Sequence, residues 1–392
     1  MHRKPPDRGL DRDGGVRRVA TVTATAADLE RLETLLSPYR ARANTAMRAL
    51  FDAYLHERPE GRSPSMRTMR RNARIFFAGK RYRYALAVAG FEGLSGNPAD
   101  SAVLRAVTWL EWYHLYTLFL DDIMDEDVRR RRLPSAWFAN TALYRGPDGA
   151  RRSILFASRR VRYGASQAIL DALRIRSLAE RAIEGATGLD PPVRERLLEE
   201  LTEVDLVLSD GQGLDIDFET AKRVREADYE AMSVRKTGRL YVGAAATAAL
   251  LADASDANRK TLEAFAIHFS TAFQDRDDLL GTGVVPSKIG GSSSGDIAQG
   301  KRTRLYAMAM ERLPAKERTA FLTSYGRGPR STTRDITRVR ELLRTYVLEA
   351  MNERIERNIA AAVDALDRIP FRDPAARDLL SLLARVQPVR AS

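Results

Sequence analysis

The sequence contains no cysteine, which excludes a disulfide framework, a thiolate metal site and a cysteine nucleophile. It also lacks any run of about eighteen uncharged apolar residues, so we expect no transmembrane helix. The N-terminal stretch MHRKPPDRGLDRDGGVRR has no apolar segment of the kind found in secretory signals. These absences predict a cytoplasmic protein without stable membrane insertion.

Lysine is scarce, because arginine supplies nearly all of the positive charge. The 64 basic residues include only eight lysines, and the formal net charge is +12. Each lysine is therefore informative, since an ammonium approaches a phosphate as a point charge and a guanidinium as a fork. A net positive charge can serve nucleic acid or an anionic membrane surface. The sequence, however, contains no helix-turn-helix, zinc-finger or RNA-binding aromatic motif, so we expect no nucleic-acid partner.

Helical periodicity dominates the 392 residues, of which 44% are apolar. We expect residues 1–25 to form a disordered tail and residues 26–392 a single large all-α domain. No alternating strands with hairpin signals occur, so a sheet is not expected. The expected helices are Ala27–His56 with a break near Pro38, Met66–Ala89, Ala99–Met124, Gln167–Gly185, Val193–Leu214, Tyr229–Ala252, Asn258–Leu280, Lys301–Arg312 and Arg334–Arg368.

Two long loops remain between these helices. We interpret the arginine-rich segment Pro134–Gly164 as a surface excursion. The segment Gly281–Gly300 is rich in glycine and serine, and we interpret it as a mobile lid.

The densest charge lies in His114–Arg132, where an apolar run leads into five carboxylates and then four arginines. Carboxylates this close repel one another unless a multivalent cation or solvent absorbs the field. On a helix, Asp121 and Asp125 share a face, whereas Asp122 lies about 100° away. Two carboxylates on one face can chelate Mg²⁺ that keeps its other contacts for water and phosphate oxygens. The alternative, a solvated acidic helix end, opposes the helix dipole.

A second acidic group, FQDRDDLL at Phe273–Leu280, follows another apolar segment. Gln274, Asp277 and Asp278 lie within one helical turn and can point together. Gly281 stands four residues after Asp277, so a chelating pair like that of the first group is incomplete here. The two groups together, with basic residues near each, indicate Mg²⁺ bridging a diphosphate.

Two pairs of residues have the chemistry to bind phosphate. Lys80 and Arg83 stand three residues apart after a glycine and would converge on one anion at the start of a helix. Lys236 and Thr237 are an ammonium and a hydroxyl that can both donate to phosphate oxygens. The alternative for the first pair is a solvated basic patch.

Three further residues are candidates by position. Lys288 and Lys301 follow the second acidic group. His114 precedes Asp121 by two helical turns, so the two lie on one side of the helix. An isolated histidine there can also be an ordinary core or surface residue.

These segments resemble the motifs of the trans-isoprenyl diphosphate synthases, the polyprenyl synthetase family, and among them bacterial geranylgeranyl diphosphate synthases. DDIMDEDVRRRRLPSAW is similar to the family's first aspartate-rich motif with its trailing arginine pair. The other motifs follow in the family's order: GKRYR, GQGLD at Gly211–Asp215, KT at 236–237, FQDRDDLL at 273–280 and GKRT at 300–303. Six motifs thus agree over about residues 27 to 310.

The resemblance implies a single all-α bundle around a deep apolar cavity, usually a homodimer. The Mg²⁺ ligands that it implies are Asp121, Asp125 and Asp277, with Asp122 and Asp278 nearby. The residues that it places on the allylic diphosphate are Arg130, Lys236, Thr237, Gln274, Lys288 and Lys301. Those that it places on isopentenyl diphosphate are Lys80, Arg83, His114 and Arg131. It places Gln212 and Asp215, with Lys236 and Thr237, at the reacting centre.

The reaction that the resemblance implies joins isopentenyl diphosphate to dimethylallyl, geranyl or farnesyl diphosphate by ionisation, condensation and elimination. The allylic diphosphate ionises only if the charge of the departing pyrophosphate is neutralised, which Mg²⁺ and basic residues do. An apolar cavity must keep the carbocation from water. In this family the released pyrophosphate is thought to take the final proton.

The expected product is geranylgeranyl diphosphate, with farnesyl diphosphate next. Tyr116 stands five residues before Asp121, and its ring would obstruct a growing chain, while Thr117 beside it leaves some space. Tyr116 can equally be an ordinary core aromatic residue.

The sequence departs from the family pattern at three places. Gly281 replaces the third aspartate of the second motif, Tyr84 stands where proline is usual, and residues 291–294 are additional between Lys288 and Gly295. Three other functions stay open. They are a class I terpene cyclase on the same fold, a non-catalytic subunit of a partner synthase, and a nucleic-acid or membrane-surface binder driven by the arginines.

Overall fold

The computed structural model describes residues 25–58, 64–130, 133–146, 155–285 and 295–386. The predicted tail covers residues 1–25, of which only Thr25 is described, as the N-cap of α1. Arg131 and Lys288 also lie outside these ranges. Among the described residues helices make up nearly the whole fold, as the periodicity predicted. The elements are α1 (Ala26–His56), α2 (Pro64–Phe76), α3 (Tyr82–Ser95), α4 (Ser101–Val107), α5 (Trp109–Met124), β1 (Arg129–Arg130), β2 (Leu133–Pro134), α6 (Ala136–Thr141), α7 (Arg159–Glu184), α8 (Pro191–Thr220), α9 (Glu226–Ser233), the π-helical turn η1 (Val234–Gly238), α10 (Arg239–Leu251), α11 (Asp256–Thr282), α12 (Gly295–Gln299), α13 (Arg304–Arg312), α14 (Ala315–Ser324), the 3₁₀ turn η2 (Gly328–Arg330), α15 (Thr333–Tyr346), α16 (Leu348–Asp367) and α17 (Pro374–Val386).

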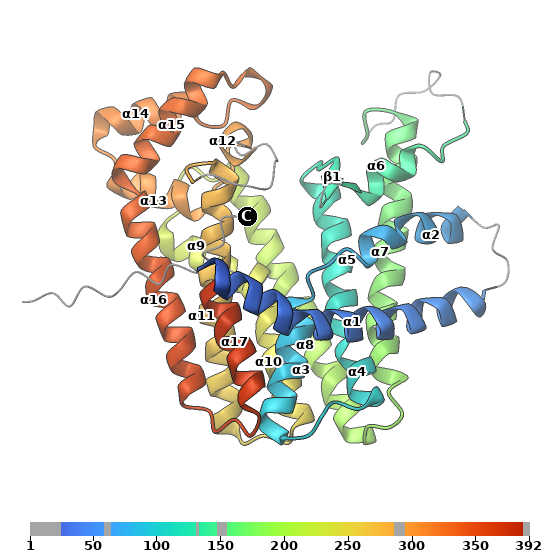
Figure 1. The fold of residues 1–392 in the computed structure, drawn as a ribbon. Helices are drawn as coiled ribbons and strands as arrows, with labels where there is room; N and C mark the ends of the chain where they lie inside the picture. The colour runs from blue at the N-terminus through green and yellow to red at the C-terminus, as the bar shows by residue number, and fades with distance from the viewer. Residues whose placement is uncertain (1–24, 59–63, 131–132, 147–154, 286–294, 387–392) are drawn as a thin grey trace, which may run out of the picture.

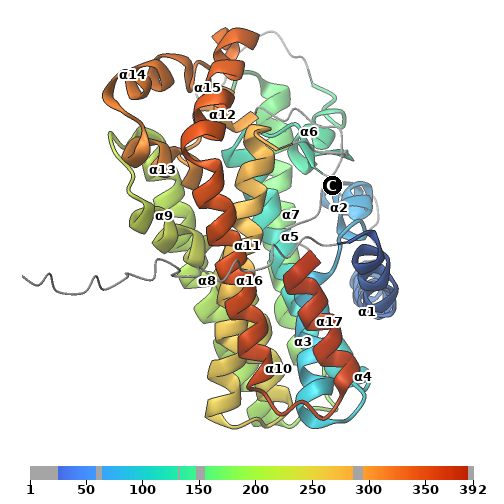
Figure 2. The ribbon, with the colours of Figure 1, turned by 60° about the vertical axis from the view of Figure 1, so that its left-hand side comes forward.

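The longer helices stand side by side, and α1 crosses the bundle in front of them (Figure 1). Helix α11 packs against α16 and α10, α10 packs against α3 and α8, and α5 packs against α7. Helix α17 returns to lie against α3 and α1, so the first and last described helices are neighbours. Figure 2 shows α16, α17 and α3 from the side, with α1 and α2 along one flank. No helix among the described residues is long and apolar enough to cross a membrane, and the predicted cytoplasmic location stays a prediction.

Aromatic packing holds α5, the helix that carries the first acidic group. Trp109, Trp112, Tyr113 and Phe119 are each at most 1% exposed. Phe76 of α2 lies edge-on to Trp112, with ring centroids 5.8 Å apart. Burial of such large rings stabilises the fold by about 1.5–3 kcal/mol each. Aromatic packing therefore fixes the position of α5, and with it the position of the acidic residues at its end.

A second cluster of buried side chains supports the end of α11, which carries the other acidic group. Leu279 of α11 packs with Leu305, Phe321 and Met351, from α13, α14 and α16. The two acidic groups are thus supported by different parts of the core.

The structure corrects several predicted helix boundaries. The predicted helix Met66–Ala89 is two helices, because the chain turns at residues 77–81 and Arg81 adopts a left-handed conformation with φ = 64°. The predicted break near Pro38 is wrong: α1 continues through this proline. The lost N–H bond is outweighed by a face on which Leu36 and Met47 are buried.

Other corrections concern interruptions. Tyr229–Ala252 is divided by the π-helical turn η1, Ala99–Met124 by Thr108, and Arg334–Arg368 by Val347. A short two-stranded pairing of Arg129–Arg130 with Leu133–Pro134 exists where no sheet was expected. Helix α17 was not predicted.

The segment Pro134–Gly164 is not simply a surface excursion. It contains α6 and the first turns of α7, and Ala136 and Asn140 are completely buried. Its Trp137 indole donates hydrogen bonds to the backbone carbonyls of Asp122 and Asp127, at 2.9 and 2.8 Å. This segment therefore fixes the chain just beyond α5. The predicted lid contains α12, but its residues 286–294 lie outside the described ranges.

Candidate active site

A cavity of about 970 Å³ opens between α3, α5, α8, α10 and α11. Most of the residues singled out in the sequence line it: Lys80, Arg83, His114, Thr117, Asp121, Asp125, Arg130, Gln212, Lys236, Thr237, Gln274, Asp277 and Lys301. We call Asp121, Asp125, Asp127 and Asp277 the acidic set, and Lys80, Arg83 and His114 the basic set. Apolar side chains of Leu118, Leu208, Leu240 and Phe273 also line the cavity.

The two aspartates that begin the first acidic group face different surroundings. Asp121 lines the cavity, whereas the neighbouring Asp122 is only 1% exposed. Nε of Arg130 donates to Asp122 at 2.6 Å, and the same guanidinium lies 3.2 Å from Asp121. Burial raises the pKa of Asp122 to about 6, although Arg130 opposes this increase. The two neighbouring carboxylates thus point in different directions, as expected for residues about 100° apart on a helix.

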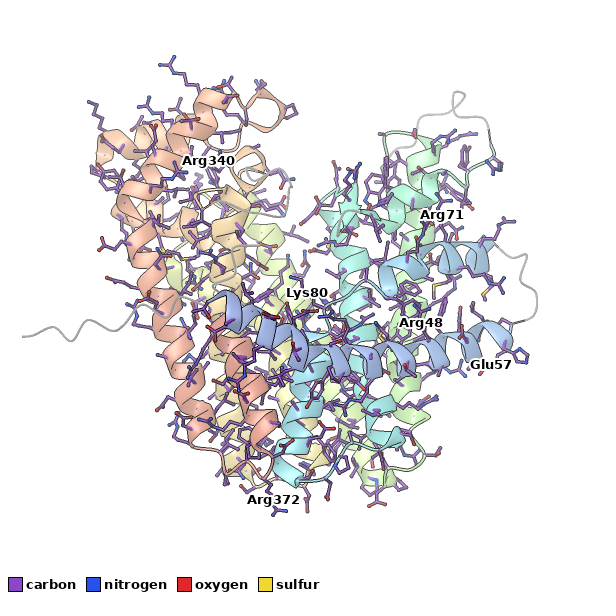
Figure 3. The ribbon with its side chains drawn as sticks, in the orientation of Figure 1. Arg48, Glu57, Arg71, Lys80, Arg340 and Arg372 are labelled. Carbon is purple, nitrogen blue, oxygen red and sulfur yellow. The ribbon has the colours of Figure 1, made fainter. Side chains whose placement is uncertain are left out.

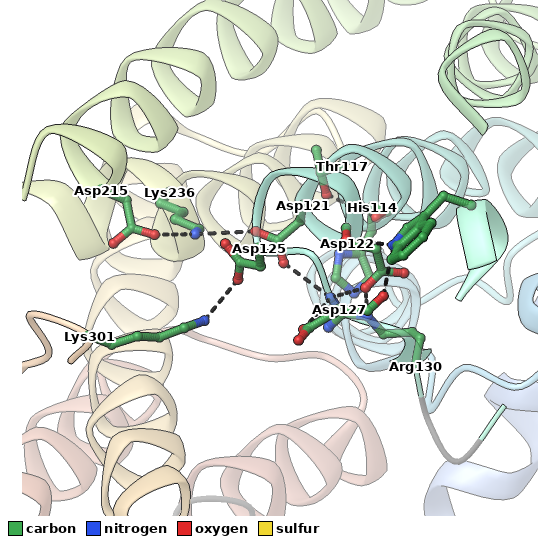
Figure 4. A network of polar contacts seen from close by, with 11 residues as sticks. His114, Thr117, Asp121, Asp122, Asp125, Asp127, Arg130, Asp215, Lys236 and Lys301 are labelled. Atoms are coloured by element: carbon green, nitrogen blue, oxygen red, sulfur yellow. Dashed lines mark hydrogen bonds and ion pairs between the residues drawn. The ribbon is translucent and has the colours of Figure 1, made fainter. Parts of the chain in front are cut away.

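Cations from distant segments pair with the cavity carboxylates of this group (Figure 4). Nζ of Lys301 donates to Asp125 at 2.8 Å. Nζ of Lys236 lies 2.5 Å from Asp215 and 3.3 Å from Asp121. Burial alone would lower the pKa of Lys236, but the two aspartates raise it. Both lysines are therefore charged and already directed at the place where the acidic set lies.

The π-helical turn η1 explains how Lys236 and Thr237 enter the cavity. A π-turn inserts an extra residue into a helix and shifts side chains out of helical register, often at functional sites. Helix α8 approaches this turn closely at Gly211, where a Cβ atom would lie 2.4 Å from the backbone nitrogen of Lys236. Glycine is thus required for the approach that brings Gln212 to the cavity.

In the second acidic group, Asp275 is paired with the guanidinium groups of Arg304 and Arg354, whereas Asp278 is held by neutral donors. Gln274 donates to Asp278 and accepts from the Thr237 hydroxyl, each at 2.9 Å. Asp278 also accepts from the backbone N–H of Arg304, and it is only 3% exposed. Burial raises the pKa of Asp278 to about 7. Asp277 lines the cavity, and burial within the fold and the negative charge of Asp296 raise the pKa of its carboxyl, while Arg276 and Arg83 oppose the increase.

Lys80 and Arg83 of the basic set are positioned by neighbouring buried residues. Among the described residues Lys80 and Arg83 have no ion-pair partner, and Arg83 lies over the ring of Tyr241 at 4.2 Å. Lys80 lies near the middle of the molecule, between the upright helices (Figure 3). Between these two residues, the buried guanidinium of Arg81 donates to Glu111 at 3.0 Å, to Asn44 at 3.0 Å and to a backbone carbonyl.

The residues present fit Mg²⁺ that arrives with a diphosphate. No three acidic or histidine side chains among the described residues lie close enough together to enclose a metal ion by themselves. Mg²⁺, however, is usually bound through one or two carboxylates together with water and substrate phosphates. Oδ1 of Asp121 is buried and accepts no hydrogen bond from any described residue, and its nearest cation is the Lys236 ammonium at 3.3 Å. The carboxylates of the acidic set can thus supply part of an oxygen shell that phosphate completes.

Some predicted residues lie elsewhere. Asp122, Asp278 and Asp215 do not line the cavity but contact residues that do. Tyr116 does not line it either, and its ring packs against Tyr113 at 5.4 Å between centroids.

The sequence reasoning assigned no role to Arg81, Glu111, Asp127, Trp137 or Asp296. Arg81 and Asp127 lie inside segments that the motifs marked. Trp137 also lies inside the first motif, whereas the contacts of Glu111 and Asp296 join different helices, so no pattern within one helix could have identified them.

Comparisons with known proteins agree with this geometry. A family model described as polyprenyl synthetase matches residues 67–343. The chain is 28% identical over 308 residues to a geranylfarnesyl diphosphate synthase of Aeropyrum pernix, covering 78% of this chain and 88% of that protein. It is 26% identical over 307 residues to a geranylgeranyl diphosphate synthase of Sulfolobus acidocaldarius, covering 78% and 85%. A structure of geranylgeranyl pyrophosphate synthase from Corynebacterium glutamicum, complexed with isoprenyl diphosphate and magnesium, superposes with a TM-score of 0.78 at 25% identity, covering 91% of this chain and 99% of that one.

Proposed function

Because this chain belongs to the polyprenyl synthetase family and is a trans-prenyltransferase, we propose that it joins isopentenyl diphosphate to an allylic diphosphate in a Mg²⁺-dependent reaction. The observation that carries this proposal is that one cavity is lined by two differently built groups of charged residues. The acidic set with Lys236 and Lys301 suits a diphosphate that brings metal ions. The basic set suits a diphosphate bound by cations of the protein alone.

We assign the allylic diphosphate to the acidic set. Mg²⁺ bound there would neutralise the charge that develops on the departing pyrophosphate. Lys236, Lys301 and Arg130 supply preorganised positive charge at the same place, which is most effective where water is scarce. Gln274 and Thr237 can exchange their mutual hydrogen bond for bonds to phosphate oxygens. Arg131 and Lys288, which lie outside the described residues, stay predictions.

We assign isopentenyl diphosphate to the basic set. The apolar side chains of Leu118, Leu208, Leu240 and Phe273 line the same cavity, where they would surround the hydrocarbon chain and keep water from a carbocation. This second region argues against a terpene cyclase, which needs no isopentenyl site. The complete first acidic group argues against a non-catalytic subunit.

The product that we propose is geranylgeranyl diphosphate. The relatives reported above carry the names of geranylgeranyl and geranylfarnesyl diphosphate synthases, and the identities of 26–28% leave the chain length of this enzyme's product as a proposal. Farnesyl diphosphate is the alternative product. Thr117 and the apolar lining residues mark the side of the cavity along which a chain would grow, but they do not define its length.

A product assay tests the proposal directly. Purified protein is incubated with Mg²⁺, isopentenyl diphosphate and, separately, dimethylallyl, geranyl or farnesyl diphosphate, and the hydrolysed products are identified by mass spectrometry. We expect elongated prenyl alcohols that require both Mg²⁺ and isopentenyl diphosphate. Cyclic hydrocarbons formed without isopentenyl diphosphate would replace the proposal with a cyclase. No product in any reaction would favour a subunit that needs a partner.

We also propose that the enzyme is a homodimer. Helix α7 exposes Ile169, Leu170 and Leu173, with 38–54% of each residue accessible, and α8 exposes Leu206 at 61%. Leu206 follows Asp205, which forms an ion pair of 2.7 Å with Arg176 of α7. Large apolar residues gathered on neighbouring helices mark an interaction surface. Light scattering of the wild type and of Leu173→Glu tests this, and two equal monomeric masses would contradict it.

A further inference from the structure

The two acidic groups differ at the position four residues after the first aspartate that lines the cavity. In the first, Asp121 and Asp125 are four residues apart and both line the cavity. In the second, Asp277 lines the cavity, but the residue four positions later on the same face of α11 is Gly281. The second group therefore lacks, within its own helix, the partner carboxylate that the first group has.

The carboxylate of Asp296 occupies the space next to Gly281. A Cβ atom built on Gly281 would lie 2.0 Å from Oδ2 of Asp296 and 2.7 Å from its Cγ. Any side chain at position 281 would collide with this carboxylate. The absence of a side chain at 281 and the presence of a carboxylate from α12 are thus complementary.

Asp296 belongs electrostatically to the cavity. Burial raises the pKa of its carboxyl, while Lys301 opposes this and Asp125 and Asp127 add to it. In turn, Asp296 is the charged residue that contributes most to raising the pKa of Asp277. Its carboxylate has no hydrogen-bond or ion-pair partner among the described residues, so it is available to a ligand.

The backbone of Asp296 has a separate task. Its carbonyl accepts hydrogen bonds from the N–H groups of Gly300 and Lys301, at 2.9 and 3.0 Å. These bonds fix the turn from which Lys301 reaches Asp125. Because the main chain makes them, a change of the Asp296 side chain removes the carboxylate and leaves them in place.

Building on the proposed function, we propose that Asp296 supplies the second carboxylate of the α11 side, in the place that Gly281 leaves open. Together with Asp277 it holds Mg²⁺ on the diphosphate, either directly or through a water molecule. Asp121 of α5 and Asp125, which caps the end of that helix, are thus matched by one carboxylate from α11 and one from α12.

The experiment exchanges the position of this carboxylate. Binding of Mn²⁺ in the presence of inorganic pyrophosphate is followed by electron paramagnetic resonance, which does not depend on turnover. The variants are Asp296→Asn, Asp296→Ala, and Asp296→Ala combined with Gly281→Asp. Asp217→Asn, an exposed carboxylate of α8 that does not line the cavity, controls for the loss of one negative charge.

We expect both single variants at 296 to weaken Mn²⁺ binding about 10-fold, as is typical when a group around a metal is removed. Asp217→Asn should bind as the wild type does. The double variant should regain most of the lost affinity, because aspartate at 281 finds the space that alanine at 296 vacates.

Unchanged affinity in Asp296→Asn, or no recovery in a folded double variant, would overturn the inference. Absence of pyrophosphate-dependent Mn²⁺ binding in the wild-type protein would instead overturn the proposed function. The near-isosteric Asp296→Asn variant keeps the test decisive if the double variant does not fold.

Discussion

The acidic set and the basic set line one cavity but are prepared for their ligands differently. The carboxylates Asp121 and Asp125 are paired with Lys236 and Lys301 in the absence of any ligand. Lys80 and Arg83 have no such partners among the described residues, and the chain between them is fixed by buried Arg81. Two carboxylates of the first region are therefore already neutralised by lysines of the protein. The other region presents positive charge on a rigid backbone, as an anion site without metal requires.

The largest effect should follow from removing a carboxylate of the acidic set. Asp121→Ala removes a predicted Mg²⁺ ligand and leaves Lys236 paired with Asp215 alone, so we expect turnover to fall on the order of 10³-fold or more. The measurement is the steady-state rate with saturating substrates over a range of Mg²⁺ concentrations. Glu126→Gln, which alters an exposed carboxylate that does not line the cavity, is the matched control. Near-normal rates for Asp121→Ala would refute the assignment.

A smaller and more selective effect should follow from loosening the basic set. Arg81→Lys keeps the charge but loses the forked contacts to Glu111 and Asn44, so the backbone that carries Lys80 and Arg83 shifts. We expect KM for isopentenyl diphosphate to rise roughly 10-fold, with little change in KM for the allylic substrate.

Glu111→Gln removes the charge that Arg81 faces and should act in the same direction. Breaking a buried ion pair costs about 3–5 kcal/mol, so the free energy of unfolding has to be measured beside the kinetics. An equal rise in both KM values would mean that Arg81 supports the whole fold rather than the basic set.

The pH dependence of stability should distinguish the two acidic groups. A carboxyl whose pKa is raised in the folded state keeps a proton there between about pH 4 and pH 7, while the unfolded chain has lost it. The free energy of unfolding therefore falls as pH rises through this window. Asp278, with a pKa of about 7 caused by burial, should contribute strongly to this slope.

Chemical denaturation of the empty protein at pH values from 5 to 8 measures that slope. Asp278→Asn should flatten it, because the variant has no carboxyl to titrate at this position. A slope that Asp278→Asn leaves unchanged would contradict this account. Addition of Mg²⁺ and pyrophosphate should stabilise the wild type more at pH 8 than at pH 6, because ionised carboxylates bind the metal.

Local periodicity predicted the parts of the site that lie on one helix. The spacing of Asp121, Asp122 and Asp125 suffices to decide which carboxylates share a face, and it places Asp121 in the cavity and Asp122 outside it. The same reasoning missed the turn at Arg81, because nothing in a single sequence marks an arginine that adopts a left-handed conformation.

Contacts between distant segments were also beyond local reasoning. Trp137 donates a hydrogen bond to the backbone near the end of α5, and Asp296 fills the space beside Gly281. Neither contact can be predicted from the spacing of residues along one helix. The sequence analysis identified Gly281 only as a missing carboxylate. The fold indicates where a replacement can come from, since it brings α12 against α11.

Chain length should show the smallest and most specific effect, and it separates two neighbours on α5. Counting back from Asp121, Thr117 is four residues away and about 40° round the helix, whereas Tyr116 is five away and about 140° round. This difference explains why Thr117 lines the cavity and Tyr116 packs against Tyr113 instead.

We therefore expect Thr117→Phe to shorten the main product by at least one isoprene unit with little loss of total turnover, because a ring there enters the path of the chain. Tyr116→Ala, which the sequence predicts to lengthen the product, should have a smaller effect, since its ring reaches the cavity only through its neighbours. Thr117→Ser is the control that keeps the side chain small. Mass spectrometry of the hydrolysed products ranks the variants. Longer products from Tyr116→Ala, together with an unchanged distribution for Thr117→Phe, would show that Tyr116 limits the chain and that the cavity extends beyond the residues that line it in the empty protein.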